Sequence, residues 1–124
     1  MIAVDSSTVI LFLHGNKSRE VDLLSVSLGT GEIVLPPVAL TKILSDPRMP
    51  AEQRKAILDW GVLEVLEGYW IRAGDTRAKL LSLKVKPPLA DTLIAQSCID
   101  HGVALITSDS DFRPFAKHCG LKLA

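Results

Sequence analysis

The sequence carries no excess of charge of either sign, because 14 lysine and arginine residues balance 14 aspartate and glutamate residues in a chain of 124. A neutral chain lacks the basic surplus with which many proteins hold nucleic acid, so such a partner would need a local basic patch or a bound cation. Cysteine is also scarce. Cys98 and Cys119 are the only two, and neither has the close partner that zinc-finger and redox motifs require. Both are expected to be buried, reduced thiols.

Long hydrophobic runs are missing as well. No uninterrupted apolar stretch reaches the ~20 residues that a membrane-spanning helix needs, and no basic leader with a cleavage site precedes Asp5. We therefore expect a cytoplasmic protein without a membrane partner. Hydrophobic residues make up 48% of the chain, and a chain of this length suits one compact domain that spans residues 1–124.

Segments with helical and strand patterns alternate along the whole chain. Short apolar runs predict strands, and longer periodic segments bounded by glycine, proline or capping residues predict helices. The predicted strands are 2–4, 32–35, 62–66, 103–107 and 121–123. The predicted helices are 8–13, 18–28, 36–45, 51–60, 69–83, 89–101 and 112–117. This order favours an α/β fold, a three-layer α/β/α sandwich around a mostly parallel sheet.

Four aspartates lie where predicted strands end or predicted helices begin. Asp5 is the only Asp, Glu, Lys or Arg between Met1 and Asn16, and Asp91 stands equally alone in a long apolar stretch. Asp109 and Asp111 follow the predicted strand 103–107. Because ligands of parallel sheets bind outside the carboxyl ends of the strands, we expect these acids to share one rim. Carboxylates so close to a core need a positive partner, and the sequence therefore predicts a divalent-metal site.

Each of these polar residues also has a simpler explanation when taken alone. Asp5, Asp91 and Asp109 are all suitable as helix N-caps or first-turn acids, and Asp111 is equally explained as a turn residue. Capping does not require the caps to converge, however, so their gathering on one rim favours the metal site.

Four segments of the chain, taken in order, resemble the PIN-domain ribonucleases. The resemblance is closest to the VapC-type toxins of bacterial toxin–antitoxin pairs, and it covers nearly the whole chain. The matching segments are Val4-Asp5-Ser6-Ser7, the stretch 35–45 that contains Leu40-Thr41-Lys42, Leu89-Ala90-Asp91-Thr92 with the following 93–95, and the stretch 105–112 that contains Thr107-Ser108-Asp109-Ser110-Asp111.

The resemblance implies a hydrolase that cuts RNA with the help of Mg²⁺ or Mn²⁺. It implies that Asp5, Asp91 and Asp109 bind the metal and that Asp111 is an additional acid close by. Hard oxygen ligands of this kind suit Mg²⁺. No side chain looks like a nucleophile, so water activated by the cation is the expected attacking group.

The resemblance also assigns supporting residues and partners. Ser6 and Thr107 match hydroxyl positions that orient water or carboxylates, although Ser6 is equally a helix cap and Thr107 equally a β-branched strand residue. A homodimer, a small antitoxin protein that covers the acidic rim, and a tRNA or other structured RNA substrate are implied. The basic residues between 48 and 86 are read as a solvated helical surface, with an RNA-backbone track as the alternative.

Lys42 departs from the family pattern. The family carries a glutamate here, typically in Leu-Thr-Glu, whereas this chain reads Leu40-Thr41-Lys42. At ~4 Å and an effective dielectric near 20, one unit-charge interaction is worth roughly 4 kcal/mol before desolvation. We expect the Lys42 ammonium to lie among Asp5, Asp91 and Asp109, to weaken metal binding and to slow or abolish cleavage. The alternative is that Lys42 extends to solvent with its stem on the core.

Two other functions remain open at this point. The first is a catalytically inactive PIN-fold module that binds antitoxin or RNA, which the Lys42 departure makes a serious alternative. The second is a phosphatase-like domain, which needs a nucleophilic aspartate with a second aspartate two residues on. Asp5 is followed by Ser6 and Ser7 and fails that test, while Asp109 and Asp111 share only the spacing.

Overall fold

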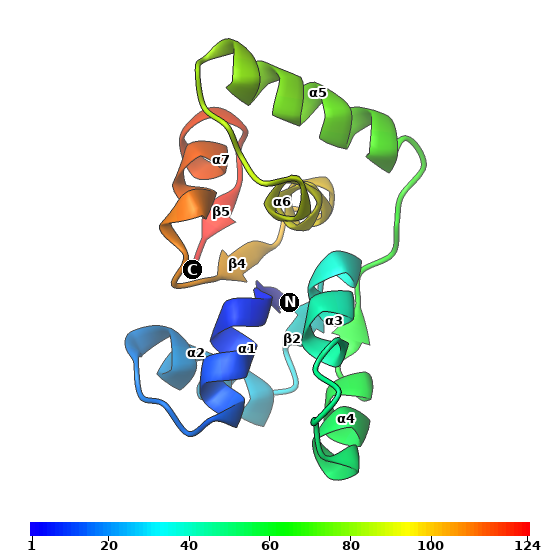
Figure 1. The fold of residues 1–124 in the computed structure, drawn as a ribbon, viewed down its shortest axis with the longest axis vertical. Helices are drawn as coiled ribbons and strands as arrows, with labels where there is room; N and C mark the ends of the chain where they lie inside the picture. Colours follow the sequence, from blue (N-terminus) through cyan, green and yellow to red (C-terminus); the bar gives the residue numbers. More distant parts are fainter.

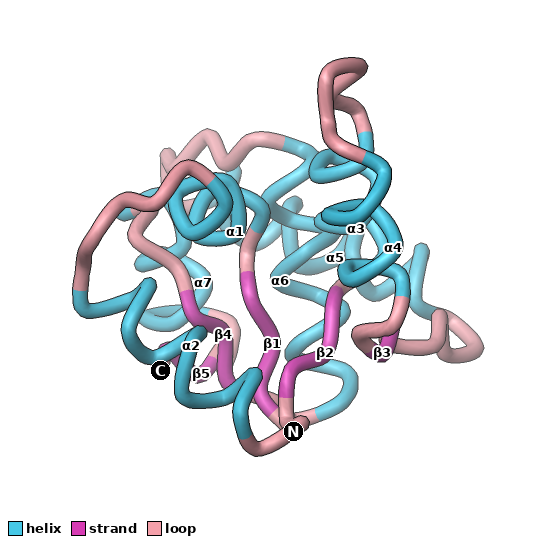
Figure 2. The backbone as a smooth tube through the Cα atoms, turned by 90° about the horizontal axis from the view of Figure 1, so that it is seen from below, coloured by secondary structure: helices cyan, strands magenta, loops and turns pink.

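The central sheet consists of five parallel strands in the order β3-β2-β1-β4-β5. A computed structural model describes all residues, 1–124. The strands are β1 (Ile2–Val4), β2 (Ile33–Leu35), β3 (Gly61–Val62), β4 (Ala104–Ile106) and β5 (Lys122–Leu123). Helices cover both faces of this sheet (Figures 1 and 2). The expected three-layer α/β/α sandwich is confirmed.

Seven α-helices and one 3₁₀ turn connect the strands. α5, α6 and α7 lie on one side of the sheet, α1 and α2 on the other, and α3 and α4 near the end formed by β2 and β3 (Figure 1). No helix is long and apolar enough to cross a membrane. The helices are α1 (Ser6–Leu13), α2 (Arg19–Gly29), α3 (Pro37–Leu44), α4 (Ala51–Leu58), α5 (Tyr69–Ser82), α6 (Leu89–His101) and α7 (Arg113–His118), and the 3₁₀ turn is η1 (Ser110–Phe112).

The short strands are buried on both faces, so successive side chains enter two different cores. In β1, Ala3 packs into the core under α5, α6 and α7, and Val4 packs into the opposite core. In β4, Leu105 and Ile106 divide in the same way. This alternation explains why the strands read as continuous apolar runs, as expected for a parallel sheet covered on both faces.

The strand order reverses beside β1, and this makes a topological switch point at one rim of the sheet. The chain leaves β1 toward β2, whereas β4 pairs with the other edge of β1, in register Val4 with Ile106. The residues that follow these two strands are Asp5 and Thr107, and the Asp5 amide donates to the Ile106 carbonyl at 3.0 Å. Such a switch point is where open α/β sheets bind their ligands.

Three predicted elements differ from the structure. The predicted strand 62–66 is wrong over most of its length, because β3 ends at Val62. The Leu63 amide still donates to the Leu35 carbonyl at 2.9 Å, and the chain leaves the sheet beyond this residue. The predicted helix 8–13 begins two residues earlier, because Asp5 caps it. The predicted helix 112–117 corresponds to α7, shifted by one residue, and the 3₁₀ turn η1 directly precedes it.

Candidate active site

Asp5 is anchored at the switch point by three donors. It is 2% exposed and is the N-cap of α1, where its Oδ1 accepts the Ser6 amide at 2.8 Å. Its Oδ2 accepts the Ser7 hydroxyl at 2.7 Å and the Thr107 hydroxyl at 3.1 Å. A buried carboxylate is tolerated when donors satisfy it in this way, and the helix N-terminus adds a favourable dipole.

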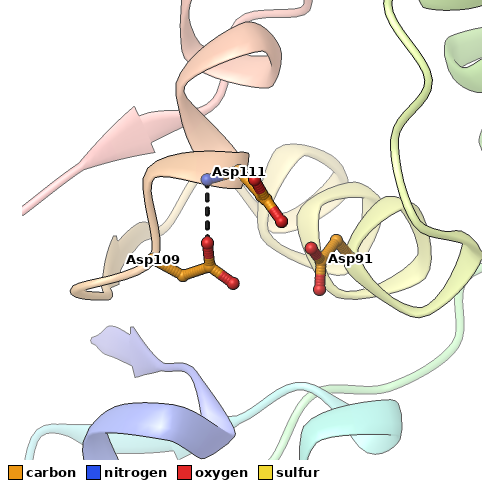
Figure 3. A group of neighbouring side chains, drawn as sticks. All are labelled: Asp91, Asp109 and Asp111. Carbon is orange, nitrogen blue, oxygen red and sulfur yellow. Dashed lines mark hydrogen bonds between the residues drawn. The ribbon is translucent and has the colours of Figure 1, made fainter.

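Thr107 connects Asp5 to the loop that carries the other acids. Its Oγ1 donates to Asp5 and accepts the Asp109 amide at 3.0 Å. The Asp109 Oδ1 in turn accepts the Asp111 amide at 2.8 Å, which begins η1 (Figure 3). One relay of hydrogen bonds therefore sets the position of Asp5 relative to Asp109 and Asp111, which lie about a hundred residues later in the sequence.

Asp91 has no comparable support. It lies in the first turn of α6 and is only 5% exposed, yet none of the side-chain hydrogen bonds of the chain ends on its carboxylate. The pKa of Asp91 is raised from 3.8 to about 6, first by burial and then by the negative charges of Asp109 and Asp5, whereas the positive charge of Lys42 opposes the rise. A raised pKa with a specific charged neighbourhood in a crevice is typical of functional groups.

Asp91, Asp109 and Asp111 form a group that fits a small cation. One carboxylate oxygen from each lies within 4.8 Å of the others, and Figure 3 shows the three side chains facing a common space. This spread is close to the span of about 4.2 Å between opposite oxygen ligands of Mg²⁺, and an all-oxygen donor set suits that ion. Asp5 lies outside this group of three but is near enough for its charge to act on Asp91.

Lys42 is exposed rather than inserted among the acids. The salt bridges of the chain are Arg19–Glu20 and Arg72–Asp100, so the Lys42 ammonium is within 4.0 Å of no carboxylate. The prediction that the Lys42 ammonium contacts the acids directly is therefore wrong. Lys42 acts on the site through space, since its charge favours the ionised form of Asp91, and its long stem lets the ammonium reach water at the end of α3.

Sequence reasoning overlooked Ser7 and overrated the Ser6 hydroxyl. Ser7 makes the shortest hydrogen bond to Asp5, whereas the Ser6 Oγ is 3.5 Å from that carboxylate and Ser6 contributes mainly its amide. A capping aspartate followed by two serines offers a hydroxyl at the second following position, and that spacing was the available signal.

A scan of protein families matches the PIN domain over residues 2–118. The chain belongs to the PIN-domain family. Its fold matches a chain in the crystal structure of VapBC2 from Rickettsia felis bound to a DNA fragment from their promoter, with a TM-score of 0.73 at 17% identity over 100% of this chain and 98% of the other. No curated protein matches the sequence.

The PIN-domain family is generally one of nucleases. The matched region contains every acid discussed above, from Asp5 to Asp111. Because the identity to the VapBC2 chain is low, this match shows a shared fold and no shared function. The chemistry of this PIN domain must therefore be argued from its own residues.

Proposed function

We propose that this PIN domain is an endoribonuclease dependent on Mg²⁺ or Mn²⁺, similar to VapC toxins, and that Lys42 impairs it. The observation that carries this proposal is the Asp91 carboxylate, which accepts no hydrogen bond from another side chain and lies beside Asp109 and Asp111. Asp91 is buried, Asp109 half-buried and Asp111 exposed, and the mutual repulsion of three such acids with no cation among them is a cost that a bound divalent ion offsets.

The residues divide into ligands and positioning groups. Asp91 and Asp109 would hold the cation, and Asp5 and Asp111 would complete the acidic group around it. The bound ion would act as a Lewis acid on the phosphate and would lower the pKa of water. Ser7 and Thr107 fix the Asp5 carboxylate through hydrogen bonds of 2.7 and 3.1 Å. Asp91, with its pKa near 6, would give up its proton as positive charge arrives.

The positive charge of Lys42 is the reason to expect weak nuclease activity. Where the family has a carboxylate, this chain has a positive charge that already acts on Asp91. A cation approaching the group meets like charge and one fewer ligand. The same observation favours a second candidate, a catalytically inactive module that keeps the fold to bind antitoxin or RNA.

The proposed partners follow from the family resemblance. They are a tRNA or other structured RNA, a small antitoxin that covers the acidic rim, and a second copy of the chain in a homodimer. We also propose that residues 1–124 form one domain and that the protein acts in the cytoplasm. Support for an antitoxin is the fold match to a chain of VapBC2, a complex of that kind.

Substituting Lys42 tests the proposal most directly. We expect Lys42→Glu to bind Mg²⁺ or Mn²⁺ at least tenfold more tightly than the wild type, since reversing one exposed charge near the site is worth at least about 1.4 kcal/mol. At saturating RNA, where weaker substrate binding does not limit the rate, cleavage of a labelled structured RNA should increase with it and should stop when a chelator is added.

The matched control is Lys42→Gln, which removes the positive charge without adding a ligand. We expect it to lie between the wild type and Lys42→Glu in both assays. Wild-type cleavage as fast as that of Lys42→Glu would contradict the impairment. If calorimetry shows no cation binding to any of the three folded proteins, the inactive binding module replaces the nuclease.

A further inference from the structure

A pocket of about 340 Å³ lies between α1, α3 and the loop that leads to α4, and Lys42 is the lining residue whose charge acts on the acidic group. Its apolar lining comes from Ile10, Leu13, Ile43 and Met49. Nothing in the acidic group uses these side chains. The volume is at the lower end of the range of about 300–1,000 Å³ for sites that hold small organic groups.

Two free cationic side chains border this apolar surface. Lys42 and Arg48 both line the pocket, both are exposed, and neither takes part in a salt bridge of the chain. The one carboxylate in the lining is Asp46, whose Oδ1 accepts the Arg48 amide at 2.9 Å and is thereby held in the local turn. Two positive charges against one negative charge leave the pocket attractive to an anion.

Lys42 joins the pocket to the acidic crevice. α3, which carries Lys42, packs against α1 on the pocket side and against α6, which carries Asp91, on the other. The Lys42 charge acts on Asp91 while its side chain lines the pocket. A ligand that extended from the pocket to the acids would therefore pass the ammonium.

We propose that this pocket receives one nucleotide of the RNA, next to the phosphate to be cut, a proposal that rests on the function proposed above. The base and ribose lie on the apolar surface of Ile10 and Met49, and the flanking phosphates meet Lys42 and Arg48. An apolar floor with cationic edges matches a nucleotide, which presents a flat ring between two anionic groups. His14 and Gln53 also line the pocket and offer hydrogen-bonding groups for the edge of the base.

Filling the pocket without changing its charge separates this site from general electrostatic attraction. Ile10 is 41% exposed, so Ile10→Trp can occupy the pocket without entering the core. The matched control is Val26→Trp on α2, since Val26 is 66% exposed and lines no part of the pocket. The probe is a fluorescein-labelled single-stranded oligouridine, with binding followed by anisotropy in chelator so that nothing is cut.

We expect Ile10→Trp to bind the RNA about tenfold more weakly than the wild type, and Val26→Trp to match the wild type. Arg48→Ala should also weaken binding and reduce the dependence of log K on log salt by about 0.7, the value for one phosphate contact on a single strand. Its matched control is Arg54→Ala on α4, which does not line the pocket and should keep the wild-type slope. Thermal melts confirm that each variant is folded.

The outcomes distinguish the two proposals. If the wild type binds RNA and folded Ile10→Trp binds it equally well, the nucleotide subsite is overturned, and a protein segment becomes the better occupant of the pocket. If the wild type binds no oligouridine in chelator, the subsite is overturned, whereas the ribonuclease proposal is decided separately by cation binding and cleavage in Lys42→Glu. A loss confined to the two pocket variants supports the subsite.

Discussion

The two ends of α6 carry the same residue type with pKa values shifted in opposite directions. Asp91 in its first turn and Asp100 in its last turn are both almost inaccessible, with 5% of the residue exposed for Asp91 and 4% of the side chain for Asp100. Burial raises the pKa of Asp91 to about 6, whereas the hydrogen bond from Arg72 lowers the pKa of Asp100. One helix therefore contains an acid that resists ionisation and an acid that favours it.

The difference lies in the partners that each carboxylate has within the chain. Arg72 donates to both Asp100 oxygens, at 2.9 Å from Nε and 2.7 Å from Nη2, and Gln96 donates at 2.8 Å. This arrangement ties α5 to α6. Asp91 instead faces other acids. A paired carboxylate stabilises the fold, and an unpaired one beside like charges is poised for a ligand from outside.

Breaking the paired end should have the largest effect on stability. In Arg72→Ala, the almost inaccessible Asp100 carboxylate keeps only Gln96 as a donor, and unsatisfied buried groups are costly. We expect the melting temperature to fall by roughly 5–10 °C. Arg54→Ala, which removes an exposed arginine from α4, is the control. Equal melting temperatures for the two variants would show that the α5–α6 tie is unimportant.

Removing the charge of Asp91, at the unpaired end of α6, should stabilise the fold instead of destabilising it. Because the folded pKa of Asp91 is raised above 3.8, its ionisation destabilises the fold as pH rises through about 6. Asp91→Asn should therefore stabilise the chain by about 1 kcal/mol above pH 6, after screening by solvent, or about 4 °C. The gain should vanish below pH 4, where wild-type Asp91 is also neutral. Thermal melts across that range in chelator check the sign, and a gain that persisted in acid would exclude the electrostatic cause.

A smaller effect is expected from the hydroxyl that anchors Asp5. Thr107→Val keeps the shape of the side chain but removes its hydrogen bonds to Asp5 and from the Asp109 amide. We expect a loss of about 1 kcal/mol in the free energy of unfolding, together with weaker cation binding because the relay to Asp109 is cut. Thr41→Val on the exposed side of α3 controls for the substitution itself. Unchanged cation affinity would mean that the relay does not position the acids.

Much of the scaffold was predictable because its signals are local. Capping residues, glycines and prolines bound the helices, and apolar runs mark the strands. The strand predicted at 62–66 failed because alternation specifies a periodic pattern and not a pairing partner: Leu63 is buried, but Val65 is 48% exposed where the chain has left the sheet.

The convergence of the acids was predictable from topology, and their exact grouping was not. Strand ends in a parallel sheet bring Asp5 and the loop after β4 together, as expected. Whether Asp5 or Asp111 lies closer to Asp91 and Asp109 depends on hydrogen bonds made by Ser7 and Thr107. The direction of the Lys42 side chain likewise depends on the exposure of the end of α3, which no sequence pattern reports.

The account rests on the need of Asp91 for a positive partner from outside the chain. A carbon-detected NMR titration of the aspartate carboxyl groups, with and without Mg²⁺, measures this directly, and Asp100 serves as an internal control in the same spectra. In chelator, Asp91 should titrate with an apparent pKa of about 6, and Asp100 should titrate below 3.8. Mg²⁺ should lower the value for Asp91 in the Lys42→Glu variant and leave Asp100 unchanged. Titration of Asp91 near 3.8 in chelator, or no response to Mg²⁺ in that variant, would contradict the account.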